Sequence, residues 1–127
     1  MHDLDILTRD WCAIHDMATL RKVASALIDV AEALHAAHGR AMAAQSDFSK
    51  EIEGTAPDIQ DTYDLANMTT DCTSAIYRVV AEARQREPQD ILESIDRIAI
   101  LAATARYNND PNCIADLRQF VGGKAVA

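Results

Sequence analysis

Apolar residues recur along the first half of the chain at alternating steps of four and three. The pattern begins after Asp16 and continues through more than four heptads without a proline. This is the period of a helix that lies along other helices. The seam positions are Leu20, Ala24, Leu27, Ala31, Leu34, His38, Ala41, Gln45, Phe48 and Ile52. The pattern predicts one long helix over residues 16–50, about 50 Å in length.

Turn residues divide the rest of the chain into shorter helical segments. Gly54 and Pro57 end the first helix, and Asp58 suits the N-cap of a second long helix over residues 59–86. The Thr and Ser residues in its centre are expected to hydrogen-bond back to the preceding turn. Pro88 is expected near the first position of a third helix over residues 88–107, with Asp90 in its first turn. Asp110 is expected to cap a fourth helix over residues 111–121.

These segments predict an all-α helical bundle in a single domain, residues 1–127. It is built on the long N-terminal helix, the second long helix and a third arm broken into 88–107 and 111–121. Laid end to end, the two pieces of the third arm nearly match the first helix in length. Residues 1–15 predict a short helix with Trp11 as its packing anchor, and residues 124–127 a loose tail. The pattern leaves open whether the first helix is continuous through Asp16 and Gly39. The residues expected to be buried are Leu27, Leu34, Ile95, Ile98 and Leu101.

Composition and charge narrow the classes of function. The chain has 49% hydrophobic residues, only 5% aromatic residues, and a net charge of −8. This charge argues against direct binding of nucleic acid, which needs clustered Lys and Arg, and favours a partner protein with a basic surface. The three cysteines are far apart, so we expect reduced thiols and a cytoplasmic protein. We expect no secretory signal and no membrane span.

One stretch of the sequence is acidic without any basic residue. Six acidic residues and no Lys or Arg occur between Glu51 and Tyr77. The aspartates on the second helix recur at steps of three and seven, which places them along one side of that helix. This acidic ridge consists of Asp58, Asp61, Asp64 and Asp71. It is either a solvated face or a docking surface for a basic patch of another protein.

A Glu-x-x-His pair on the first helix raises the question of a metal site. Glu32 and His35 have the spacing used by di-metal carboxylate proteins built from helices. Such sites repeat the motif and add two further Glu residues, and this chain contains the pair once. We therefore expect no metal ion and no cofactor.

The sequence around His35 supports a second hypothesis. The motif is His35-Ala-Ala-His38-Gly39-Arg40-Ala41. It resembles the core of histidine phosphotransfer domains, with His38 in place of the usual Lys. The resemblance implies that His35 accepts a phosphoryl group, that Gly39 clears space for a response regulator, and that a neighbouring cation steadies the phosphoryl group.

Two functions remain open from the sequence. The first is a non-catalytic protein that binds another protein as an adaptor, an inhibitor or an antitoxin-like neutraliser. It is supported by the lack of a convergent acid, base and nucleophile, and the length of the first helix leaves room for a homo-oligomer through that helix. The second is a phosphotransfer module that uses His35.

Overall fold

The computed structural model describes residues 9–51 and 59–122. Within these ranges the chain is all-helical, and no strand is present. The helices are α1 (Arg9–Ile14), α2 (Met17–Glu51), α3 (Ile59–Gln85), α4 (Ile91–Asn108) and α5 (Pro111–Gly122). The predicted all-α bundle is therefore confirmed. The predicted N-cap Asp58 and the seam position Ile52 lie outside the described residues.

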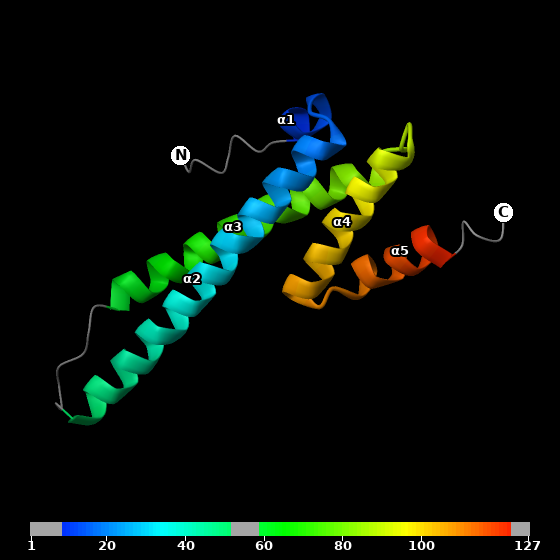
Figure 1. Cartoon of the computed structure of the whole chain (residues 1–127). Helices are drawn as coiled ribbons and strands as arrows, with labels where there is room; N and C mark the ends of the chain where they lie inside the picture. The colour runs from blue at the N-terminus through cyan, green and yellow to red at the C-terminus, as the bar shows by residue number, and fades with distance from the viewer. Residues whose placement is uncertain (1–8, 52–58, 123–127) are drawn as a thin grey trace.

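The long helices α2 and α3 form an antiparallel hairpin that dominates the molecule (Figure 1). The Sγ atom of Cys72 in α3 donates to the carbonyl oxygen of Leu27 in α2 at 3.4 Å, so these two positions lie side by side. Both helices are continuous where the sequence was ambiguous. Helix α2 passes through the exposed Gly39, and in the middle of α3 the hydroxyl groups of Thr69 and Thr70 donate to the carbonyls of Leu65 and Ala66, as expected.

The start of α2 is separated from α1 by a sharp break at Asp16. The carboxylate of Asp16 accepts a hydrogen bond from the backbone N–H of Thr19 at 2.8 Å, so it is the N-cap of α2. Trp11 of α1 packs at the edge of the core and lies against the ring of His15, with 4.0 Å between ring centroids. The predicted anchor role of Trp11 is consistent with this packing.

Arg86, just after α3, fastens α1 to the hairpin. Its guanidinium donates to the backbone carbonyls of His15 at 2.7 Å, Cys12 at 2.9 Å and Ala13 at 3.4 Å. These carbonyls lie at the C-terminal end of α1, where the helix no longer supplies its regular N–H donors; the Cys12 carbonyl also accepts a long hydrogen bond from the backbone N–H of His15, at 3.4 Å. One side chain thus satisfies a helix end that is more than seventy residues away in sequence.

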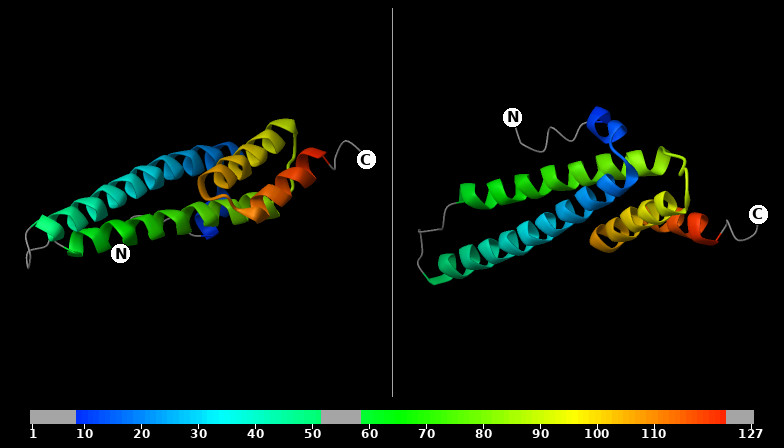
Figure 2. Two further views of the ribbon diagram at one scale, coloured as in Figure 1. Left: turned by 90° about the horizontal axis from the view of Figure 1, so that it is seen from below. Right: turned by 45° about the horizontal axis from the view of Figure 1, so that its top comes forward.

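Helices α4 and α5 cover only one end of the hairpin, as all three views show (Figures 1 and 2). The expectation that they lie end to end along the long helix is wrong. Asn109 adopts the left-handed conformation (φ 49°), and α5 then turns back along α4. The guanidinium of Arg97 in α4 consequently lies 3.9 Å from the ring centroid of Phe120 near the end of α5, and Arg84 of α3 pairs with Asp116 of α5.

The core lies where α2, α3 and α4 meet, beside α1. Its largest fully buried aliphatic side chains are Leu20, Ile28, Ile76, Ile100 and Leu101. Burying each side chain of this size contributes roughly 1.5–3 kcal/mol. Leu27 and Leu101 are buried as predicted, whereas Leu34 is only half-buried because α4 ends near its level.

Two predictions for α4 are wrong. The helix begins at Ile91 rather than at Pro88, because Asp90 has an extended backbone (φ −152°) and accepts from the N–H of Glu93, which makes Asp90 the N-cap. The helix is also rotated relative to the orientation that would bury Ile95 and Ile98 as predicted. Ile95 is 54% exposed and Ile98 is half-buried, while Arg97 and Thr104 are buried.

The rotation of α4 has a physical reason. Arg97 donates to the carbonyl of Arg86 at 3.2 Å and stacks on Phe120, and the hydroxyl of Thr104 donates to the carbonyl of Ile100 at 2.8 Å. Burial of a polar group costs less free energy when it has such partners, although the Nε atom of Arg97 is buried without a hydrogen-bond partner. The rotation leaves Ile91, Leu92 and Ile95 on the outside of the molecule.

Candidate functional site

The acidic ridge is described in part. Asp58 lies outside the described residues, and for Asp61 only the backbone position in α3 is described. Asp64 is exposed and Asp71 is half-buried. The structure therefore places two of the four predicted ridge residues, and both are on the outer surface of α3.

Asp64 and Asp71 border a shallow hollow that the sequence pattern did not indicate. We call this the Met68 hollow; its volume is about 460 Å³ and it is lined by Asp64, Asn67, Met68, Thr70 and Asp71. Met68 is 50% exposed and lies between the two aspartates at helical spacing. An accessible apolar side chain with carboxylates on both sides can contact an apolar residue of a partner protein when basic residues flank that apolar residue.

The hollow belongs to the part of the hairpin that α4 and α5 do not cover. We call this part the distal arm; it comprises residues 36–51 of α2 and 59–72 of α3. Met42 on its α2 helix is 49% exposed, and Tyr63 on its α3 helix is 62% exposed. In the arm each helix has one described helical neighbour, so apolar side chains that a third helix would cover elsewhere face solvent.

His35 lies at the boundary between the covered end and the distal arm. It is exposed, and its Nε2 atom is 3.2 Å from the hydroxyl oxygen of Tyr107. His38 is half-buried, and Gly39 and Arg40 are exposed. A Cβ atom added at Gly39 would meet no atom within 4 Å, so the surface beside His35 is open at this point. The predicted cluster thus has an accessible histidine, which is already in contact with a tyrosine.

The sequence analysis missed two sets of polar contacts between α3 and the end of α4, which together we call the polar network. The hydroxyl of Tyr107 is 2.9 Å from that of Thr73, while the hydroxyl of Tyr77 donates to Asp110 at 2.5 Å and accepts from Asn108 at 3.0 Å. The hydrogen bond from Tyr77, together with the backbone N–H of Cys113, holds the pKa of Asp110 below its ordinary value. Burial raises the pKa of Tyr77. The network joins α3 to the α4–α5 turn.

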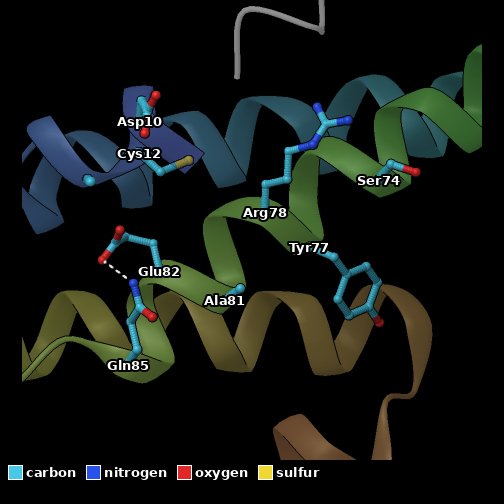
Figure 3. A pocket seen from close by; sticks show the side chains of 9 residues that line it. Asp10, Cys12, Ser74, Tyr77, Arg78, Ala81, Glu82 and Gln85 are labelled. Carbon is cyan, nitrogen blue, oxygen red and sulfur yellow. Dashed lines mark hydrogen bonds between the residues drawn. The ribbon is translucent and has the colours of Figure 1, made fainter. Parts of the chain in front are cut away.

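A larger cavity of about 650 Å³ lies between α1 and α3 (Figure 3). Its polar lining includes Asp10, Ser74, Arg78, Glu82 and Gln85, and Gln85 donates to Glu82 at 3.1 Å. Cys12 borders the cavity but is fully buried, and burial raises the pKa of its thiol. A raised pKa is the opposite of what activates a cysteine nucleophile.

The other cysteines and the candidate metal ligands can be placed in the same way. Cys72 and Cys113 are free and buried like Cys12, and burial raises the pKa of both thiols. Glu32 is exposed on α2. Among the described residues, no group of three His, Cys, Asp or Glu side chains is positioned to hold a metal ion. None of the described helices has the length and apolar character needed to cross a membrane.

Comparison of the chain with protein-family models, with curated proteins and with solved structures gave no significant match. Interpretation of the site therefore depends on its own geometry and chemistry.

Proposed function

We propose that this protein acts by binding another protein, as an adaptor, an inhibitor or an antitoxin-like neutraliser, and that it is not an enzyme. The partner presents a basic amphipathic helix that docks on the distal arm, with an apolar residue in the Met68 hollow. The observation that carries this proposal is the exposed Met68 between Asp64 and Asp71 on a face that no described helix covers.

Charge supports a basic partner in preference to a neutral one. The net charge is −8, and the segment from Glu51 to Tyr77 has no Lys or Arg. Carboxylates at the rim of a docking surface steer a cationic partner and reject an anionic one, which includes nucleic acid. A cytoplasmic location belongs to the proposal, since free thiols suit a reducing compartment.

A labelled synthetic peptide tests the proposal directly. The peptide is a designed amphipathic helix with Leu on one face and Lys and Arg on its flanks, and the comparison peptide has Glu in place of the basic residues. We expect binding of the basic peptide alone, with amide chemical-shift changes concentrated at residues 64–71. Raising the salt concentration from 50 to 300 mM should weaken binding roughly tenfold, because exposed charges are screened.

Two variants with equal change in charge locate the surface. D64N/D71N removes two charges from the Met68 hollow, whereas D29N/E32Q removes two charges from exposed positions on α2. The first variant should lower the association rate for the basic peptide several-fold, and the second should have little effect. Equal effects of the two variants, or shift changes away from the arm, would contradict the proposal.

Phosphotransfer at His35 is a second candidate, supported by the exposure of His35 and the open surface at Gly39. Incubation with phosphoramidate would transfer a phosphoryl group to an imidazole nitrogen with release of ammonia. Acid-labile phosphate that is lost in H35Q and retained in H38Q would support this function. Equal labelling of the two variants, or no labelling of the parent protein, would exclude His35 as the acceptor.

A further inference from the structure

The outward face of α4 carries a contiguous apolar surface. Ile91 is 74% exposed, Leu92 is 68% exposed and Ile95 is 54% exposed. Ile98 and Ala99 are half-buried and Ala102 is exposed. Single exposed apolar residues are normal on protein surfaces, but several on consecutive turns of one helix indicate an interaction site.

The spacing within this surface is that of a helix-pairing seam. Ile91, Ile95, Ile98 and Ala102 recur at steps of four, three and four, as in helices packed side by side. We call these four residues together with Leu92 and Ala99 the α4 seam. The inner side of α4 is already occupied, because Ile100, Leu101 and Thr104 face the core. The seam is therefore a second packing face of the same helix.

The size of the side chains in the α4 seam changes along the helix. Large side chains run from Ile91 and Leu92 through Ile95 to Ile98, and small ones follow at Ala99 and Ala102. An antiparallel copy of the same helix would set large residues against small ones, with Ile95 opposite Ala102 and Ile98 opposite Ala99. A parallel copy would set isoleucine against isoleucine and alanine against alanine, which packs less well.

The helix dipoles favour the same arrangement. An antiparallel copy brings the N-terminal end of each α4 beside the C-terminal end of the other. Asp90 and Glu93 at the beginning of α4 lie on the side of Arg97 and Ile100, away from the seam, and bond to the backbone of their own helix end, so they take no part in the pairing. The surface is thus complementary to itself in size.

We propose that two copies of this chain pair through the α4 seam, with the α4 helices antiparallel and the two-fold axis between Ile98 and Ala99. This interface is separate from the distal arm and from the long helix, so a dimer leaves both Met68 hollows accessible. The seam spans about 16 Å along one helix, which is at the small end for a specific interface. The dimer should therefore dissociate on dilution.

Sedimentation velocity of the full chain from 5 μM to 1 mM tests the pairing. We expect a shift from monomer to dimer across this range, and at least a tenfold weaker association in I95R. The matched control is M68R, because Met68 is 50% exposed and lies on the other surface. M68R should dimerise like the parent. A parent protein that stays monomeric at 1 mM, or a dimer that I95R leaves intact or that M68R abolishes, would overturn the proposal.

Cross-linking tests the antiparallel register and does not depend on I95R folding normally. In A99C the two introduced thiols lie next to the two-fold axis, so a short bismaleimide should link them. In I91C the thiols of the two copies would lie about 22 Å apart along the helices and should not be linked. The native cysteines are buried, so the parent chain serves as the control for background. Equal linking of A99C and I91C would contradict the antiparallel pair. This holds whether the linking comes from another way of pairing two chains or from random encounter.

Discussion

Replacing Arg86 with Gln should release α1 from the hairpin. The guanidinium makes short hydrogen bonds to the carbonyls of His15 and Cys12, a longer one to Ala13, and an ion pair to Glu82 at 3.5 Å. A hydrogen bond from a charged donor contributes about 1.5–3 kcal/mol. The side chain is 21% exposed, and water can therefore replace part of this interaction. We expect R86Q to lower the free energy of unfolding by about 2–3 kcal/mol.

Two measurements separate local release from general damage. Urea denaturation followed by circular dichroism gives the change in unfolding free energy. Trp11 is the only tryptophan, so its fluorescence reports the docking of α1. In R86Q the Trp11 signal should change at lower urea concentration than the helical signal, because α1 detaches before the hairpin unfolds.

Two further variants control for the loss of charge. R86K keeps the charge but lacks the planar fork that reaches several carbonyls, so its stability should lie between those of R86Q and the parent. R118Q removes an arginine from an exposed position on α5 and should change stability by less than about 0.5 kcal/mol. If R86Q unfolds within about 0.5 kcal/mol of the parent with an unchanged Trp11 signal, the role assigned to Arg86 is wrong.

Three other predictions follow from packing, titration and thiol burial. L101A should cost about 2–5 kcal/mol in urea unfolding, whereas I95A should cost less than about 1 kcal/mol, because Leu101 is buried and Ile95 is not. The lowered pKa of Asp110 stabilises the folded protein above the ordinary pKa of 3.8, and this stability is lost as the pH falls through the lower pKa of the folded state. The variant D110N should therefore flatten the acid side of a curve of unfolding free energy against pH. A thiol reagent at pH 8 should label the native protein slowly and the urea-unfolded protein rapidly, at the buried cysteines Cys12, Cys72 and Cys113.

The helices could be predicted from sequence because their signals are local. The seam through Leu20 and Leu27 identified α2, and Asp110 before Pro111 identified the start of α5. Each of these signals depends on residues within a few positions of one another, as helical geometry requires. The start of α4 was misplaced because Pro88 and Asp90 are both good helix-start residues, and only the backbone of Asp90 distinguishes them.

The rotation of α4 and the polar network could not be predicted, because they depend on contacts between distant residues. Arg97 can be buried only because Phe120 and the carbonyl of Arg86 lie beside it. His35 and Tyr107 meet across 72 positions of sequence, and Tyr77 reaches Asp110 across 33. No periodicity in the chain specifies such pairs. The aspartates of the ridge were visible in the sequence. The exposure of Met68 between them could not be predicted, because it depends on how the helices are arranged around it.

The uncovered distal arm has a consequence for how motion is distributed in the molecule. Amide hydrogen exchange reports the free energy of local opening, and this energy follows the number of packed neighbours. Along α2, amides near Leu20 and Ala31 should exchange only on global unfolding, whereas those beyond His38 should exchange through smaller openings of the hairpin tip. A partner that docks on the arm would slow the second group and leave the first unchanged. The free energy of local opening would thus fall along α2 toward the hairpin tip. The order of that end of the helix would then depend on whether a partner is bound.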